Sequence, residues 1–206
     1  MSRLIVTNVE TQNIKFDSDT TAFTIGSDGV VTGTGNNFAM VKLNETTVSS
    51  SVSLVAFDNT IITSTYDNYY VTIQNAVLAA NNGDLRAQCS INNGTGFVTH
   101  ECSLSYFQVN GSNSGRYNAR TSIMITEDEH SNAAKGINGN FTVFGVNGST
   151  TKDANSNGHC TNYGTDTHQY SYMGYTAIDT TSAINYIKVF SDQNITAGKF
   201  TIYGIK

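Results

Sequence analysis

The chain has 206 residues, of which 38% are hydrophobic and 13% charged, and its 11 Lys and Arg against 16 Asp and Glu give a net charge of −5. The basic residues are scattered singly between Arg3 and Lys206, so the sequence lacks the basic patch that nucleic acids and anionic membranes require. Pro and Trp are both absent. Turns must therefore be built from Gly, Asn, Asp and Ser, and Tyr and Phe must supply the aromatic core.

The N-terminal part is interpreted as an extended anchoring and oligomerisation segment. It contains short strand-like stretches at residues 4–6, 22–25 and 30–32, and its apolar residues are too few to bury a core. The three apolar residues at positions 4–6 are also too few for a signal peptide, and no stretch approaches the roughly 20 apolar residues of a membrane span. A boundary between residues 44 and 51 separates this segment, residues 1–46, from one domain at residues 47–206.

The remainder predicts a series of short strands joined by tight turns. Period-two alternation indicates strands at residues 38–43, 51–57, 69–76, 85–91, 104–109, 121–125, 141–146, 170–175, 184–190 and 200–205. Asn-Gly pairs predict hairpin turns, because they readily adopt positive φ angles, and they begin at Asn82, Asn93, Asn110, Asn138, Asn147 and Asn157. The expected fold is all-β, an antiparallel β-sandwich of jelly-roll type with almost no helix.

Residues 149–168 predict a long polar loop that is exposed and tolerates substitution. Within it, Asp153, Asn155, Asn157 and Gly158 match the first half of a calcium-binding loop, in which alternate oxygens surround the ion. The twelfth position is Gly164, where a bidentate Glu is required. We therefore interpret this stretch as an Asn-Gly turn in a polar loop; whether the loop binds a cation or another ligand stays open.

Two groups of residues contain side chains that can ligate zinc, but their spacing does not bring the ligands together around one ion. Zinc requires three or four ligands that a scaffold brings together, whereas neighbouring residues on a strand point to opposite faces. The two groups are His159-Cys160 with His168, and His100-Glu101-Cys102. The second group is expected to alternate between buried and exposed positions along a strand, so no metal site is expected.

No motif in the sequence argues for catalysis. The acidic run Glu127-Asp128-Glu129-His130 could supply paired carboxylates, but its residues are consecutive and are expected on an exposed turn. No nucleophile elbow, phosphate-binding loop or zinc-protease motif is present. The three cysteines, Cys89, Cys102 and Cys160, are odd in number and lack metal-ligand spacing, which indicates reduced thiols. We expect no enzymatic activity, no catalytic or cofactor-binding residues and no cofactor.

The C-terminal strands contain YTAIDTTSAI at residues 175–184, IKVF at 187–190 and AGKFTIYGI at 197–205, with YDNYYVTI at 66–73 and SINNG at 90–94 further upstream. This set of motifs resembles a recurrent ending of phage virion structural proteins of the head-decoration and fibre-appendage type. The resemblance covers residues 51–206, about three quarters of the chain, and its motifs determine strands, not active sites. The N-terminal stretch from Leu4 to Val31 is similar to the leader of phage fibre and appendage proteins.

This resemblance implies a non-enzymatic virion protein displayed on the particle surface, as capsid decoration or a short tail-fibre-like appendage. The expected partners are two further copies of the chain, in a homotrimer, and capsid or tail proteins of the virion. The alternative is a receptor-binding module, in which exposed Tyr and Asn side chains of the polar loops bind a host-surface glycan. A small depolymerase that acts through Glu127, Asp128 and Asp166 is a further rival, for which we expect no hydrolysis.

Overall fold

The computed structural model describes residues 40–108, 114–127, 136–161 and 169–206, together with the backbone of three short strands between residues 13 and 33. The chain divides into two compact units, Met1–Ala39 and Met40–Lys206. Each unit has its own sheet.

The first unit contains a three-stranded antiparallel sheet in the order β1-β2-β3, formed by Asn13–Lys15, Thr21–Ile25 and Val31–Gly33. The strands predicted at residues 22–25 and 30–32 correspond to β2 and β3, whereas residues 4–6 lie outside the described part. The two units divide after Ala39, earlier than the predicted boundary between residues 46 and 47. The reason is that β4 (Val41–Val48) pairs with the last strand of the second unit.

The described residues of the second unit form eleven strands, all paired antiparallel. After β4 these are β5 (Val52–Phe57), β6 (Asn68–Leu78), β7 (Arg86–Ser90), β8 (Thr99–Gln108), β9 (Ser114–Arg120), β10 (Ile123–Met124), β11 (Ile137–Phe144), β12 (Lys152–Thr161), β13 (Gln169–Asp179) and β14 (Tyr186–Ile205). The prediction of an all-β antiparallel fold is confirmed. The described residues contain no helix of the length and apolar character that crossing a membrane demands.

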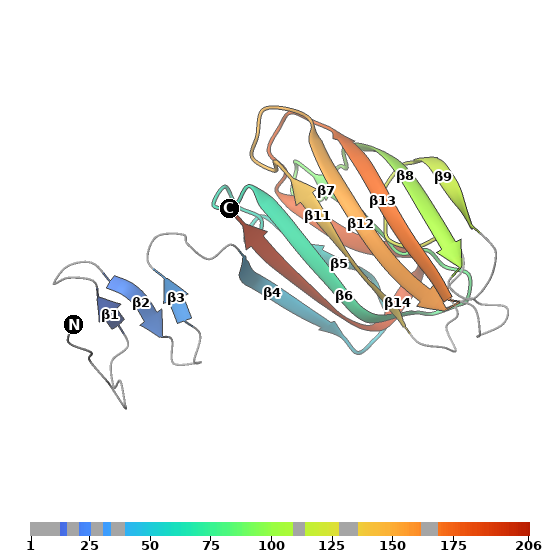
Figure 1. Ribbon diagram of the computed structural model, residues 1–206, viewed down its shortest axis with the longest axis horizontal. Coiled ribbons are helices and arrows are strands. Elements are labelled where there is room, and N and C mark those ends of the chain that lie inside the picture. The colour runs from blue at the N-terminus through green and yellow to red at the C-terminus, as the bar shows by residue number, and fades with distance from the viewer. Residues whose placement is uncertain are drawn as a thin grey trace, which may run out of the picture. The chain divides into compact units, whose positions relative to one another are not determined.

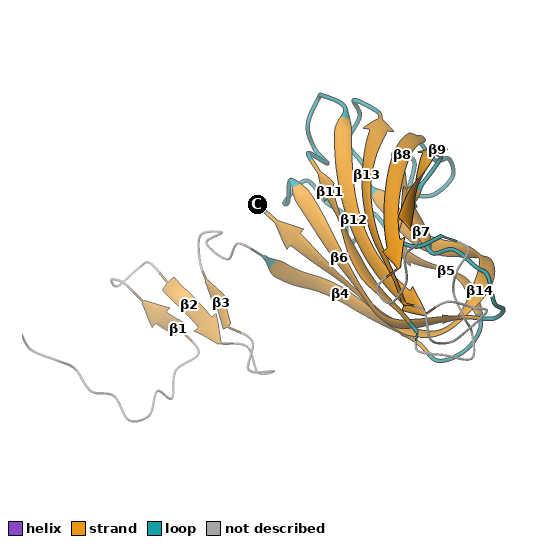
Figure 2. Cartoon of the chain, turned by 45° about the vertical axis from the view of Figure 1, so that its right-hand side comes forward, coloured by secondary structure: helices purple, strands orange, loops and turns teal. Residues whose placement is uncertain are grey.

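The last strand, β14, belongs to two layers. Its first part, from Tyr186 to Phe190, pairs with β5 and β7, and its second part, from Ile195 to Ile205, pairs with β4 and β6, with one further pair between Ile195 and Val52 of β5. The larger layer has the order β4-β14-β6-β11-β12-β13-β8-β9 and the smaller layer the order β5-β14-β7-β10 (Figures 1 and 2). This arrangement is sandwich-like, while jelly-roll connectivity stays a prediction. The strands predicted at residues 184–190 and 200–205 are one continuous element.

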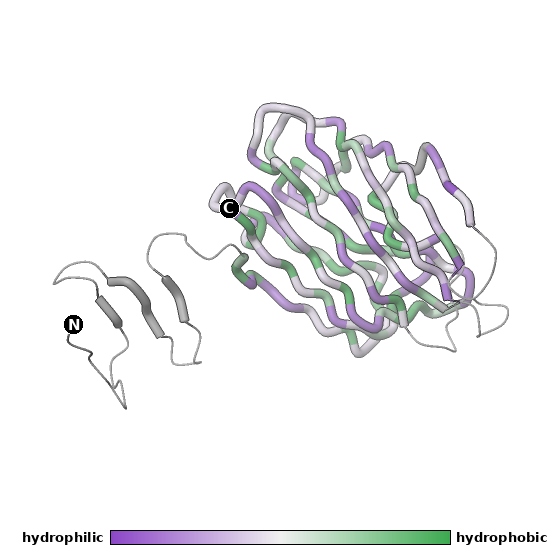
Figure 3. The backbone as a smooth tube through the Cα atoms, viewed as in Figure 1, coloured by the Kyte–Doolittle hydropathy of each residue, from purple (hydrophilic) through white to green (hydrophobic). Residues whose placement is uncertain are grey.

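The inner faces of the two layers share one core. Its large, fully buried members come from many strands and include Phe57, Tyr69, Leu104, Phe141, Tyr172 and Phe200. The short strand β10 contacts β8, β12 and β13 of the larger layer. Figure 3 shows hydrophobic and hydrophilic residues alternating along the strands, as a sheet with one buried face requires.

Residues 152–161 form β12, a strand in the middle of the larger layer, so the prediction of a polar loop is wrong here. The strand pairs with β11 on one side and β13 on the other. Its inward residues are all buried, and they are Lys152, Ala154, Ser156, Gly158 and Cys160. Because most of them are small or polar, the strand lacks the apolar alternation by which other strands were recognised. Of the predicted loop, residues 162–168 lie outside the described part.

The predicted Asn-Gly turns divide into two groups. Asn82 and Asn93 adopt positive φ angles of 61° and 49° between strands, and Asn147 lies in a turn closed by a 2.9 Å hydrogen bond from the Gly148 amide to the Gly145 carbonyl. Only the turn at Asn147 joins two paired strands, β11 and β12, and is confirmed as a hairpin. The chain bends at Asn82 and turns at Asn93, but β6 does not pair with β7, nor β7 with β8, so the hairpins predicted at these two pairs are wrong. The pairs at Asn138 and Asn157 lie within β11 and β12, so those two turns are wrong, and the pair at Asn110 lies outside the described residues.

The glycines of the two misassigned pairs have a packing role. Gly139 and Gly158 are cross-strand partners, and the chain at Ile125 crosses the inner face of the sheet beside them. A Cβ at Gly158 would collide with the Ile125 carbonyl oxygen, and a Cβ at Gly139 would collide with the Ile125 side chain. The Ser156 hydroxyl donates a 2.5 Å hydrogen bond to the Met124 carbonyl. Glycine is therefore required by close approach of another backbone.

The substitution Gly158→Ala should destabilise the larger unit by about 3 kcal/mol, because the added methyl group has to push the Ile125 segment off the sheet. The control is Gly96→Ala at an exposed site, where an added Cβ meets no atom closer than 4.0 Å. Urea unfolding followed by circular dichroism measures both. Equal midpoints for the two variants would contradict the packing role of Gly158.

Candidate functional site

The outer face of the larger layer presents polar side chains in rows across the strands. Outward residues that face each other on neighbouring strands form one row. One row contains Ser103 on β8, Tyr175 on β13, Asn155 on β12 and Thr142 on β11. The next row contains Ser105, Met173, Asn157 and Asn140 on the same four strands. Hydroxyl and amide groups thus surround one aromatic and one thioether side chain.

Exposed apolar side chains follow a diagonal across this face. They are Phe107 on β8, Met173 and Tyr175 on β13, and Phe144 on β11, with exposed fractions of 48%, 60%, 56% and 40%. The pairing register puts these four residues in four successive rows, moving from β8 toward β11. They are four of the seven large apolar residues exposed in the described part of the chain. This line of exposed apolar groups among polar side chains makes the outer face the candidate binding surface.

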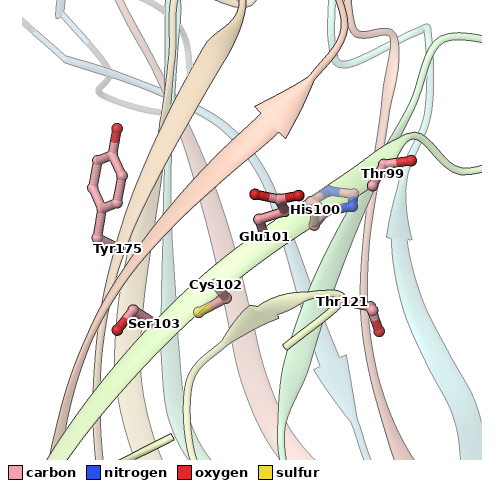
Figure 4. A pocket seen from close by; sticks show the side chains of 7 residues that line it. All are labelled: Thr99, His100, Glu101, Cys102, Ser103, Thr121 and Tyr175. Atoms are coloured by element: carbon pink, nitrogen blue, oxygen red, sulfur yellow. The ribbon is translucent and has the colours of Figure 1, made fainter. Parts of the chain in front are cut away.

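Tyr175 is held in place although its ring is exposed. Its hydroxyl donates a 2.5 Å hydrogen bond to Oδ1 of Asp153 on β12, one row away on the neighbouring strand. The Asp153 carboxylate favours the protonated phenol and so raises the pKa of Tyr175. Figure 4 shows the Tyr175 ring standing away from its strand. The ring is therefore a fixed apolar platform, because its far end is tied to a second strand.

A shallow depression of about 380 Å³ lies beside this platform. Its walls include Ser105, Arg116, Asn155, Asn157, Met173 and Tyr175. Next to it, the Ser103 hydroxyl donates a 3.2 Å hydrogen bond to the side-chain oxygen of Asn118. The depression combines hydrogen-bond donors and acceptors with one aromatic face, which is the composition of a site for a polar organic ligand.

A second depression, of about 510 Å³, lies along β8 and contains the residues 100–102 (Figure 4). Glu101 is exposed on the outer face, whereas His100 and Cys102 are buried on the inner face. The predicted alternation of burial along this strand is confirmed. Because Glu101 points to the opposite face from His100 and Cys102, the three side chains do not converge on one metal ion.

His100 is a structural residue of the core. Its Nε2 accepts a 3.1 Å hydrogen bond from the Cys89 amide, which links β8 to β7. Burial disfavours the charged imidazolium and lowers the pKa of His100 from 6.5 to about 4. The residue is therefore neutral at physiological pH, so that it can accept this bond.

The calcium-loop and zinc residues fall on a flat strand. Asp153, Asn155 and Asn157 are alternate outward residues of β12, so they form a line and do not surround an ion. His159 is exposed, whereas its neighbour Cys160 is buried on the opposite face. The third member of that group, His168, lies outside the described residues. No group of three or more His, Cys, Asp or Glu that could hold a metal ion occurs in the part of the chain that the structure describes.

The acidic run begins with a buried residue, and the cysteines are buried as well. Glu127 is buried, so the prediction of an exposed turn is wrong at this residue, while the other three residues of the run, 128–130, lie outside the described part. All three cysteines are buried. Burial raises the pKa of Cys89 to about 12, so its thiol is not a nucleophile near neutral pH.

Comparison with known proteins finds no matching family model, no matching curated protein and no matching solved structure.

Tyr175, Met173 and Phe107 were not identified as site residues from the sequence. The strand predictions at residues 104–109 and 170–175 contain all three, and alternation places Met173 and Tyr175 on one face. Their neighbours Asn155 and Asn157 could not be found, because the residues around them were interpreted as a loop. The missing information is the register between β12 and β13, which no local pattern encodes.

The His100 pKa predicts a loss of stability on mild acidification. The unfolded chain binds a proton at His100 below about pH 6.5, whereas the folded chain resists it until about pH 4. The stabilising contribution is therefore present above pH 6.5 and is lost as the pH falls to 4, by up to about 3 kcal/mol. The variant His100→Gln should lack this slope, and His159→Gln on the exposed face should keep it. Urea titrations from pH 4 to 7 measure all three proteins, and equal slopes would refute the assignment.

Proposed function

We propose that the chain is a non-enzymatic surface protein of a phage particle, in which residues 1–39 attach to the particle and the unit Met40–Lys206 is displayed. The observation that carries the proposal is the division of the chain into two units of unequal size, each with its own sheet. A small attachment unit before a large self-contained β unit is the organisation that a displayed protein needs.

The strands that the structure describes in the first unit are too short to be stable alone. Its strands have only 3, 5 and 3 residues. Sheets this small are marginal in water unless they pack against another surface. Its few apolar residues include Leu4, Ile5, Val6, Phe16 and Phe23. Docking onto a shell or tail protein would cover these side chains and supply further strand partners.

The resemblance to virion proteins lies in residues that this fold needs. The motifs at residues 187–190 and 197–205 both lie in β14, and the motif at 175–184 begins in β13. The strand β14 pairs with four others, so its sequence is tied to the architecture. The likeness therefore supports a shared architecture, and a shared place on the virion is part of the proposal. Assembly as a homotrimer is a further part of the proposal, and sedimentation of the purified chain tests it.

The proposal predicts that residues 40–206 fold alone but do not attach. This truncated protein should melt cooperatively near the temperature of the full chain, because all strand partners of β4–β14 are retained. Residues 47–206 should melt at a lower temperature, because this cut removes most of β4. Mixed with particles that lack the protein, the full chain should bind and residues 40–206 should not, as labelled antibody shows by electron microscopy.

Two outcomes would contradict the proposal. Normal binding of residues 40–206 would refute the first unit as the attachment element. Failure of the full chain to bind particles, together with its absence from particles that carry the gene, would refute a place on the virion.

A further inference from the structure

We propose that the outer face of β8, β13, β12 and β11 binds a neutral polysaccharide along the diagonal from Phe107 to Phe144, with Tyr175 as the stacking platform. The inference goes beyond the proposed function and does not depend on it, because it concerns a surface of the unit Met40–Lys206 alone. From the sequence, glycan binding was expected at the polar loops. The inferred site lies instead on a defined face of the sheet.

The aromatic platform has the properties that sugar binding requires. A pyranose ring has one face of C–H groups, which packs on an aromatic ring, while its hydroxyls remain at the edge. The Tyr175 ring is more than half exposed and is tied to Asp153 through its hydroxyl. Because the hydrogen bond already restricts the Tyr175 side chain, ligand binding removes little further side-chain entropy. Stacking on this ring therefore has a smaller entropic cost than stacking on a freely rotating side chain.

The polar groups around the platform can bind the edge hydroxyls of a sugar. Asn155 lies directly opposite Tyr175, and Asn157 lies opposite Met173. Ser103 and Ser105 occupy the other side of the same two rows, on β8. Amides donate and accept at once, as hydroxyls do, so these side chains match the hydroxyls of a sugar in both directions. The depression beside Tyr175 places Asn155, Asn157 and Arg116 around one volume.

The arrangement fits a linear polymer better than a protein. The core of a protein interface is a contiguous apolar patch, whereas here four apolar side chains lie in single file between polar ones. The diagonal spans three strand spacings and three rows, roughly 25 Å in total. That length accommodates several sugar rings in an extended chain.

The charges near the diagonal favour a neutral polymer over an acidic one. Among the residues that the structure describes, the charged side chains near the diagonal are Asp153, Glu101 and Arg116, so carboxylates outnumber cations there. The only lysine of β12, Lys152, is buried on the inner face, where its Nζ donates to three backbone carbonyls. An anionic polymer would thus meet little attraction here, and the chain as a whole carries a net charge of −5.

The test uses the purified full chain and defined polymers. Electrophoresis in native gels cast with dextran, laminarin, yeast mannan or galactomannan detects binding as retardation, and alginate serves as the acidic polymer. At least one neutral polymer should retard the chain, and alginate should not. For the polymer that binds, Tyr175→Ala should raise the dissociation constant about tenfold and Asn155→Ala about fivefold.

Two further variants control for exposure and for the ring. Phe97→Ala removes another exposed aromatic ring, one that packs against Tyr186 and Lys188 on the smaller layer, and it should leave the dissociation constant unchanged. Tyr175→Phe keeps the platform and loses the bond to Asp153, so it should bind within about threefold of the parent. Unchanged melting temperatures show that each variant is folded.

Several results would overturn the proposal. No retardation by any of the four neutral polymers excludes a neutral polysaccharide site, and stronger retardation by alginate excludes the neutral class. Equal binding by Tyr175→Ala and Phe97→Ala excludes this face. Sedimentation could also show that Tyr175→Ala dissociates an oligomer while Phe97→Ala leaves it intact. That result would assign the face to contact between copies of the chain. Each of these measurements is independent of whether the chain attaches to particles.

Discussion

The fold of the larger unit depends on the pairing of β14. This strand is hydrogen-bonded to β5 and β7 in its first part and to β4 and β6 in its second part, so it lies inside both layers. The common core contains Ile187 and Val189 from the first part of the strand and Phe200 and Ile202 from the second part. Because one continuous strand belongs to both layers, neither layer can slide in register without breaking the other. The chain's own C-terminal sequence thus fixes the relation between the layers.

A second constraint acts within the larger layer, where the chain at Met124 and Ile125 lies directly on β11 and β12. This close contact leaves room only for Gly139, Ser156 and Gly158 on the inner face. The inner side of β12 therefore carries few apolar groups, and the strand is held by its backbone pairing on both sides. The outer side of the same strand carries Asp153, Asn155 and Asn157. The proposed binding face thus rests on a strand whose position is fixed by packing underneath it.

The sequence predicts those strands whose inward residues are large and apolar, as Tyr69, Val71 and Ile73 are in β6, because burial imposes a period of two. The prediction fails at β12, because small inward residues do not produce this alternation. It also fails at Asn157-Gly158, because the sequence alone does not show whether a Gly serves a turn or allows another backbone to approach closely. It also splits β14 in two, because the polar residues between Phe190 and Ile195 look like a turn. For the binding face, the exposed Tyr and Asn residues could be anticipated as a type. Their convergence could not, since it depends on the β12–β13 register.

The binding face depends on residues 152–161 forming a paired strand, because this strand brings Asn155 and Asn157 beside Tyr175 and Met173. Amide hydrogen exchange of the full chain, resolved by residue, tests this directly, since paired amides inside a sheet exchange far more slowly than those of a loop. The account predicts that the amides of β12 exchange as slowly as those of its neighbour β11, and far more slowly than those of Ser149 and Thr150 in the connection between them. Exchange throughout residues 152–161 at the rate of that connection would contradict the strand and the binding face built on it.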